Sequence, residues 1–347
     1  MRQVIWVAGL LGIGVLLVGW LRGPPRTGAR GGTVLPGGVL VAYSPSYRVS
    51  FFGIERLHPF DIDKMDHIAD HLVAQGLLGP DDFAIGSPAS DEELASVHDP
   101  AYLASLHRTP VLSRALEIWV PAIFPRSTLE RRVRGPFRAA VGGTVAAARA
   151  AVAHGVGINL GGGFHHAHPA MGHGFCIYND VALAIGTLRS EGFTAPILIV
   201  DTDAHQGDGN HAFFADDPSV TSFSIHQGSL FPVPKVPGDL DVELAAGDGD
   251  ARLQAELTRW LEVLLDEVQP GLIVHVAGAD VLIDDPLTEL TVTPDGLVAR
   301  DLEVLRVARG RGVALLHVLA GGYGPSAATA QAHSVAAMLR SLRQSSG

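Results

Sequence analysis

From residue 39 onward, short apolar runs alternate with longer stretches that have helical periodicity. The apolar runs are too short for buried helices and are rich in β-branched residues, which indicates buried strands. Strands that alternate with helices favour a parallel sheet covered on both faces, so we expect a three-layer αβα domain. The predicted strands are residues 39–43, 158–160, 197–200, 221–225, 272–277 and 313–319, and the predicted helices are 61–76, 139–153, 179–189, 251–268, 294–309 and 327–342.

The amino-terminal stretch has a different character. Residues 4–21 are uncharged and apolar, with tryptophans near both ends, and their number is at the lower limit for crossing a bilayer. This predicts a membrane anchor within 1–22, on an undetermined side of the membrane; a cleaved signal segment, and hence export, is the alternative. The Gly-, Pro- and Arg-rich stretch 23–38 is typical of a linker, so the globular domain is expected over 39–347.

Composition narrows the function. The formal net charge of −11 argues against a broad basic surface for direct nucleic-acid binding. The single cysteine, Cys176, excludes an internal disulfide and a cysteine-cluster metal site. The oligomeric state is left open.

The most informative segment follows the strand 197–200. Asp201, Asp203 and His205 are spaced by two, so in extended chain their side chains point to the same side, and Asp208 follows after a glycine. Carboxylate oxygen and imidazole nitrogen are ordinary zinc donors, and the carboxyl end of a strand is where α/β proteins place their chemistry. Taken by itself, this segment is equally compatible with an Asp/Gly turn that carries a surface histidine.

Three other predicted strands also end in unusual residues. They are followed by Gly161-Gly-Gly-Phe-His-His166, by Gly278-Ala-Asp280 and by Gly321-Gly-Tyr323. In a parallel sheet these ends share one edge, so their side chains can converge.

Convergence would give these residues distinct roles. Asp203, His205 and Asp280 would make a three-ligand zinc site with an open position, which is the mark of catalytic zinc. His165 and His166 would act as general acid and base, with Asp201 and Asp208 as the carboxylates that orient them. Tyr323 would donate to the developing oxyanion.

With these motifs in order, the chain resembles the zinc-dependent histone deacetylase family and its bacterial deacetylase-like relatives. Segments such as Tyr43-Ser-Pro-Ser-Tyr47 and Leu57-His-Pro-Phe-Asp61 are most similar to the class IV branch. The resemblance implies an arginase/deacetylase fold, one Zn²⁺ per chain held by the three ligands above, and a narrow substrate channel. It also implies a K⁺ site. The implied channel residues are His58, Gly174, Phe175 and Gly322, and the K⁺ site would include Asp201, Ser224 and Ile225.

The implied activity is hydrolysis of an N-acyl amide, with an acetyl- or longer acyl-lysine protein as substrate. A small acylated amine, such as an acetylpolyamine, is the alternative substrate, and a catalytically silent acyl-lysine binding module is a third possibility. A two-manganese ureohydrolase is disfavoured because Gly207 and Leu282 stand where further ligands would be needed. Other branches of the family carry an acidic rim residue for the substrate backbone, whereas 121–140 offers only Glu130.

Overall fold

The computed structural model describes residues 29–50, 53–120 and 124–344. In this part of the chain, one seven-stranded sheet runs in the order β1-β2-β7-β6-β3-β4-β5, and every neighbouring pair is parallel. The strands are β1 (Val39–Ala42), β2 (Val156–Asn159), β3 (Ile197–Asp201), β4 (Val220–Gln227), β5 (Leu240–Leu244), β6 (Leu272–Val276) and β7 (Ala314–Val318). The predicted parallel αβα architecture is confirmed.

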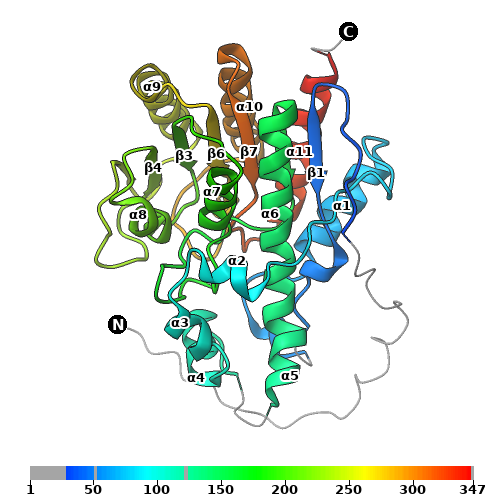
Figure 1. Ribbon diagram of the computed structural model, residues 1–347. Helices are drawn as coiled ribbons and strands as arrows, with labels where there is room; N and C mark the ends of the chain where they lie inside the picture. Colours follow the sequence, from blue (N-terminus) through cyan, green and yellow to red (C-terminus); the bar gives the residue numbers. More distant parts are fainter. Residues whose placement is uncertain (1–28, 51–52, 121–123, 345–347) are drawn as a thin grey trace.

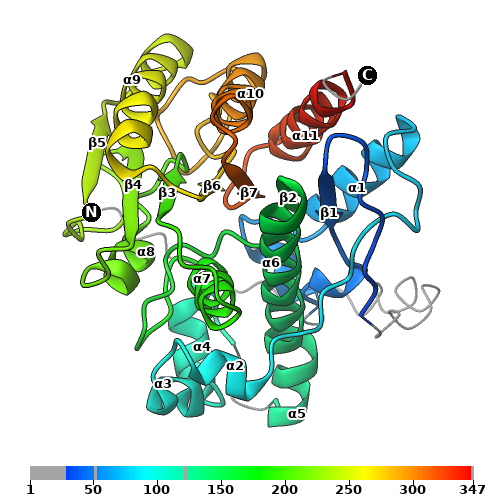
Figure 2. The same cartoon turned by 45° about the horizontal axis from the view of Figure 1, so that its top comes forward.

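Helices cover both faces of the sheet (Figures 1 and 2). One face packs against α1, α9, α10 and α11, and the other packs mainly against α6 and α7, with α8 beside β4. Their bounds are α1 (Lys64–Ala74), α6 (Gly135–His154), α7 (Asp180–Ser190), α8 (Asp208–Phe214), α9 (Asp250–Val268), α10 (Pro294–Arg311) and α11 (Ala327–Gln344). Because both faces are covered, β3 and β6 are buried along their whole length, as their continuous apolar sequence predicted.

The close approach of α6 to the sheet depends on small residues. The backbone of Gly157 in β2 lies against the carbonyl of Ala147 in α6, and a Cβ at residue 157 would clash with it. Alanine and glycine in α6 therefore let the helix lie close enough to cover the strands that end at the site.

Several elements were not predicted. The edge strand β5 alternates buried and exposed residues and carries Asp241 and Glu243, so its pattern is weaker than that of a central strand. The sequence 98–103 predicts a turn into a short helix, and α3 (Pro100–Ser105) confirms it. The other short elements were missed: α2 (Asp91–Ala95), α4 (Thr109–Ala115), α5 (Arg126–Leu129), the π-helical turn Glu130–Arg134, and the 3₁₀ turns Pro45–Tyr47 and Ile54–Leu57. Segments of this length have too few turns to show a clear periodicity.

The described part of the predicted linker packs on the domain. Arg30 pairs with Ile85 through two backbone hydrogen bonds, Thr33 N donates to Asp82 O, and Leu35 belongs to the core. The packed chain therefore begins at residue 30 or earlier, and not at residue 39.

The prediction of membrane attachment needs correction. Among residues 29–50, 53–120 and 124–344, no helix combines the length and the apolar character that a bilayer crossing requires. The apolar run 4–21, on which the prediction was based, lies outside the described residues. The predictions of a transmembrane helix, a membrane partner and a membrane-anchored localisation are wrong for the described chain and are not kept.

Candidate active site

Four strands bring the predicted site residues to one edge of the sheet. The loops after β2, β3, β6 and β7 carry, in that order, the His165-His166 pair, the Asp203/His205 segment, Asp280 and Tyr323. These strands are neighbours in the order β2-β7-β6-β3 and are all parallel, so their carboxyl ends meet. The predicted convergence is therefore present in the fold.

Asp203, His205 and Asp280 surround a common point. Each carboxylate has one oxygen held from outside by a backbone amide: Gly321 N donates to Asp203 Oδ2 at 3.0 Å and Ala204 N donates to Asp280 Oδ1 at 2.9 Å. The other oxygens face the same imidazole nitrogen, with His205 Nδ1 at 3.2 Å from Asp203 Oδ1 and at 2.9 Å from Asp280 Oδ2. Two carboxylates and one imidazole thus present three donor atoms inward, all within 4.8 Å of one another.

The charges of this trio fit a bound cation. Burial, together with the nearby Asp203 carboxylate, raises the pKa of Asp280 to about 7. Although burial lowers it, the two carboxylates raise the pKa of His205 to about 10. Two buried carboxylates thus compete for one imidazole proton, and a divalent ion in its place would satisfy all three donors. The chemistry of the donor set therefore fits a zinc-type site.

The histidine pair is positioned by a glycine turn. Gly162 and Gly163 have φ angles of +91° and +82°, which side-chain-bearing residues rarely adopt. The carboxylate of Asp180 holds the turn by accepting from Gly163 N at 2.9 Å and from Phe164 N at 2.7 Å. His165 and His166 follow directly, with their ring centroids 4.1 Å apart.

Each ring of the pair has its own carboxylate, as predicted. His165 Nδ1 lies 2.7 Å from Asp201 Oδ2, and His166 Nδ1 lies 2.5 Å from Asp208 Oδ1. A Cβ at Gly174 would clash with the His166 ring, so glycine at this position leaves room for the ring. Each Nδ1 is engaged by a carboxylate, which leaves each Nε2 free to face the site.

The two rings differ in proton affinity. Burial opposes charge on His165, but Asp201 and Asp203 outweigh it and raise the pKa of His165 to about 9. Burial and the neighbouring His165 lower the pKa of His166 to about 3, against the effect of Asp208. We expected a carboxylate to increase the basicity of both rings; the structure has this effect for His165, whereas burial and His165 dominate at His166.

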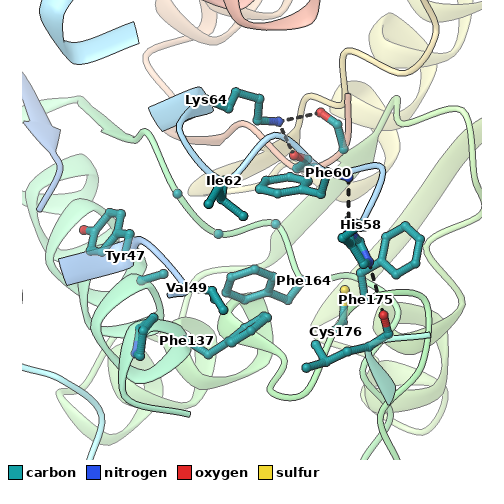
Figure 3. A pocket seen from close by; sticks show the side chains of 18 of the residues that line it. Tyr47, Val49, His58, Phe60, Ile62, Lys64, Phe137, Phe164, Phe175 and Cys176 are labelled. Atoms are coloured by element: carbon teal, nitrogen blue, oxygen red, sulfur yellow. Dashed lines mark hydrogen bonds between the residues drawn. The ribbon is translucent and has the colours of Figure 1, made fainter. Parts of the chain in front are cut away.

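Tyr323 lies on the loop after β7, which is fixed from two sides. Asp285 accepts hydrogen bonds from Tyr323 N at 2.7 Å and from Gly324 N at 3.0 Å. On the other side, Lys64 donates from Nζ to Ala320 O and Gly321 O, both at 2.9 Å (Figure 3). Burial and the Asp280 and Asp203 charges raise the pKa of Tyr323 well above its usual value, so its hydroxyl keeps its proton.

An apolar cavity leads to these groups. His58, Phe175 and Tyr323 line it, as do the glycines after β2 (Figure 3). The rings of His58 and Phe175 are 4.2 Å apart, and those of Phe175 and Tyr323 are 5.6 Å apart. The channel residues predicted from the family resemblance are on this wall, including Gly174. The exception is Gly322, which is buried behind the wall against Ala279 and Ala327.

The residues of the expected K⁺ site are also neighbours. Asp201 in β3 pairs in register with Ser224 in β4, and Ile225 follows. The Asp201 oxygens already accept from Asp203 N and contact His165 Nδ1, and Ser224 Oγ lies 2.9 Å from His226 Nδ1. The monovalent ion stays a prediction.

Two residues at the site were missed from the sequence. Glu117 lines a second pocket beside His166, His205 and Tyr323. It has a positive φ of 53° and accepts from Gly174 N at 3.3 Å, whereas Glu130 pairs with Arg134 and Arg138. Lys64 reaches the Tyr323 loop from the start of α1. The available signal for Lys64 was that it is one of only two lysines in the chain; Glu117 had none.

Comparisons with known proteins agree with this geometry. Residues 58–339 match the histone deacetylase domain family. The chain is 37% identical over 302 residues to histone deacetylase 2 of Arabidopsis thaliana, covering 86% of this chain and 78% of that protein. It is 33% identical over 272 residues to the acetoin utilization protein AcuC of Bacillus subtilis, covering 72% and 68%. The crystal structure of the HDA15 HD domain has the same fold, with a TM-score of 0.71 and 22% identity over 88% of this chain and 89% of that one.

Proposed function

Since this chain belongs to the histone deacetylase family, we propose that it is a zinc-dependent deacylase that hydrolyses N-acyl-lysine side chains of proteins. One observation carries this proposal: three inward-facing donors, from Asp203, His205 and Asp280, lie beside a carboxylate-backed histidine pair at the end of an apolar cavity.

The donor set supports zinc in particular, because two carboxylate oxygens and one imidazole nitrogen leave a position open for water and substrate. A bound Zn²⁺ would polarise the acyl carbonyl and lower the pKa of the attacking water. The buried side chains around it would exclude bulk water and strengthen every charge interaction at the reacting atoms.

The two histidines would divide the proton work. His166 is neutral and has its Nδ1 engaged by Asp208, so its Nε2 can accept the proton of the attacking water and pass it to the leaving amine. His165 would hold a positive charge against Asp201 and stabilise negative charge that develops at the acyl group. The protonated hydroxyl of Tyr323 would donate to the carbonyl oxygen.

The shape of the cavity supports acyl groups longer than acetyl. Phe164, Phe137 and Tyr47 line it (Figure 3), and so do Val133 and Ala140. These are apolar walls, and each methylene buried there would contribute about 0.8 kcal/mol. His58 and Phe175, whose ring centroids are 4.2 Å apart, also line the cavity and would contact the lysine stem.

The test is a panel of acetyl-, octanoyl- and myristoyl-lysine peptides together with acetylputrescine, each measured with and without a chelator. We expect chelator-sensitive turnover of lysine peptides, with a higher kcat/KM for octanoyl than for acetyl. Ala140→Leu, which narrows the cavity, should lower turnover of the octanoyl substrate while the acetyl substrate on the same variant serves as the control. If acetylputrescine is the only substrate that is hydrolysed, the small-amine alternative is favoured. If no substrate is hydrolysed, the catalytically silent acyl-lysine binding module is the remaining candidate.

A further inference from the structure

A second cluster of potential metal ligands lies on the outer side of the histidine pair. We propose that His168, His173 and Asp208 form a second binding site for a divalent transition-metal ion. The Nε2 atoms of both histidines and one oxygen of Asp208 lie within 4.8 Å of one another, and this group is separate from the Asp203/His205/Asp280 trio.

The two histidine nitrogens lie close to the same oxygen of Asp208. His168 Nε2 lies 2.7 Å and His173 Nε2 lies 2.9 Å from Asp208 Oδ2. His168 is aligned for a hydrogen bond, whereas His173 Nε2 has no hydrogen-bond partner despite its short distance. An imidazole nitrogen that is close to a carboxylate but not aligned with it is poorly satisfied by hydrogen bonding and well placed for coordination.

The geometry needs little adjustment to accept an ion. Zinc–nitrogen and zinc–oxygen bonds of about 2.0–2.2 Å in a tetrahedral site would require the donors to move apart by about half an ångström from their present contacts. Side-chain torsions of the two histidines can supply such a movement. Two imidazoles and one carboxylate favour borderline ions such as Zn²⁺ or Co²⁺ over Ca²⁺ or Mg²⁺.

The backbone that carries both histidines is already fixed. His168 and Met171 pair across a tight turn, as do His173 and Cys176. The ring of His98 anchors the start of this loop, with Nδ1 at 3.1 Å from His168 O, and its Nε2 accepts from Asn179 N at 3.0 Å. A preformed loop lowers the entropy cost of binding, as expected for a site and not for a mobile surface turn.

Accessibility distinguishes this cluster from the inner trio. The side chains of His168 and His173 are 16% and 18% exposed, whereas that of Asp208 is 1% exposed. Phe231 lies over the cluster, with its ring centroid 5.1 Å from that of His173 and 5.0 Å from that of His166. The two histidine rings are therefore partly exposed, whereas the donor atom His173 Nε2 and the Asp208 carboxylate are buried.

Occupancy would have a functional consequence, which rests on the function proposed above. Asp208 holds His166 through Oδ1 and would hold the second ion through Oδ2. The ion and His166 would thus share one carboxylate, and we expect metal in excess of the first equivalent to inhibit hydrolysis.

The binding test counts metal directly. Chelator-stripped full-length protein is dialysed to equilibrium against increasing Co²⁺, and bound cobalt is measured by atomic emission. We expect two equivalents for the wild type and one each for His173→Ala, His168→Asn and Asp280→Ala. His333→Ala is the matched control and should keep two, because His333 is exposed and pairs only with the His71 ring in the described structure. If the His168 and His173 variants still bind one equivalent of cobalt at the inner site, their fold is intact.

A wild type that saturates at one equivalent, or two retained equivalents in both the His168 and His173 variants, would overturn the second site. In the activity test, excess Zn²⁺ should inhibit the wild type, and His173→Ala should need at least about tenfold more Zn²⁺ for the same fractional inhibition, each relative to its own rate at one equivalent. Two bound equivalents without any hydrolysis would overturn the proposed function and leave the site standing. One bound equivalent with full hydrolysis would overturn the second site and leave the proposed function standing.

Discussion

Two clusters of buried histidine and aspartate lie on the same sheet, and they differ in what balances their charge. The upper cluster is the Asp203/His205/Asp280 trio at the strand ends. The lower cluster lies between β6, β7 and α10: His275 and His317 are paired in register with their Nδ1 atoms 3.1 Å apart, and Asp301 lies beside them. Both clusters are buried and both use the same residue types.

The lower cluster contains a buried arginine that pairs with its aspartate, and the Asp203/His205/Asp280 trio does not. In the lower cluster, Arg300 donates from Nε to Asp301 Oδ1 at 2.8 Å, and Ser334 and Thr202 complete the network. Burial lowers the pKa of His275 well below its usual value and that of His317 to about 4, so both rings stay neutral. The lower cluster is thus balanced from within the protein. In the upper cluster two carboxylates face one imidazole, and a bound cation would complete the balance.

The largest effect on metal binding and on the hydrolytic rate is expected from a substitution in the upper cluster. Asp280→Ala removes one of three donors, so the protein should lose its bound metal at the inner site and its hydrolytic rate should fall by at least about 10⁴-fold. Metal content by atomic emission and turnover of an acyl-lysine peptide measure both. In the metal-free state the variant and the wild type should have similar melting temperatures, because the change also removes a buried carboxylate. Retained metal at the inner site with retained turnover would contradict the assignment.

The lower cluster should respond in stability and not in metal binding. Asp301→Ala leaves Arg300 buried without its carboxylate, so we expect the free energy of unfolding to fall by about 3–5 kcal/mol. Urea unfolding measures this change. A folded Asp301→Ala protein should still bind an ion at the Asp203/His205/Asp280 site. Loss of that ion without a loss of stability would show that the lower cluster also supports metal binding, against this comparison.

Tyr323→Phe tests the donor beside the upper cluster. Without the hydroxyl, kcat should fall by about 10²- to 10³-fold while the metal content stays that of the wild type. Tyr178→Phe is a matched control, because the Tyr178 hydroxyl is buried against Arg134 and away from the cavity. Equal losses in the two variants would indicate a packing effect.

Acid should weaken the lower cluster. His317 has a pKa of about 4 when folded, because it is buried, and about 6.5 when unfolded, so the unfolded chain binds the extra proton first. Its contribution to stability is complete above pH 6.5 and is lost as the pH falls from 6.5 to 4, at up to about 1.4 kcal/mol per pH unit. Urea unfolding between pH 7 and 4.5 checks the slope, which should be shallower in His317→Asn. An unchanged slope would show that His317 does not titrate on unfolding.

The smallest effect is expected at Lys64, which touches the Tyr323 loop and not the donors themselves. Lys64→Met keeps the volume and removes two hydrogen bonds to Ala320 O and Gly321 O. We expect kcat to fall by about tenfold with KM and metal content little changed, because the loop loses its brace while the ligands stay. Steady-state kinetics on an acyl-lysine peptide give the split, and a change confined to KM would argue against a positioning role.

The sequence predicted the part of the site that parallel topology dictates. Four strand ends in one parallel sheet had to share an edge. The strand spacing of Asp201, Asp203 and His205 was not confirmed, because β3 ends at Asp201 and the other two residues lie in the bend that follows, from which they still converge with Asp280. The resemblance to the histone deacetylase family and the arginase/deacetylase type of fold are confirmed. The assigned roles of the site residues remain predictions.

What could not be predicted depends on distant contacts. Lys64 reaches the Tyr323 loop across more than 250 residues, and Glu117, in a backbone conformation with positive φ, reaches Gly174 N. Asp201 and Asp203 raise the pKa of His165 against the effect of burial, whereas burial and the neighbouring His165 lower the pKa of His166, and no local spacing reveals this difference. The prediction of a membrane anchor failed for a different reason. Hydropathy identifies an apolar run that is long enough to cross a membrane, but it does not show where that run lies in the structure.

The most direct measurement is a zinc titration of chelator-stripped protein, followed by turnover of an octanoyl-lysine peptide. We expect activity to rise in proportion to Zn²⁺ up to one equivalent, to fall with further zinc, and to be absent throughout the titration of the Asp280→Ala variant. Full activity in the stripped protein, or equal activity in the Asp280→Ala variant, would contradict this expectation.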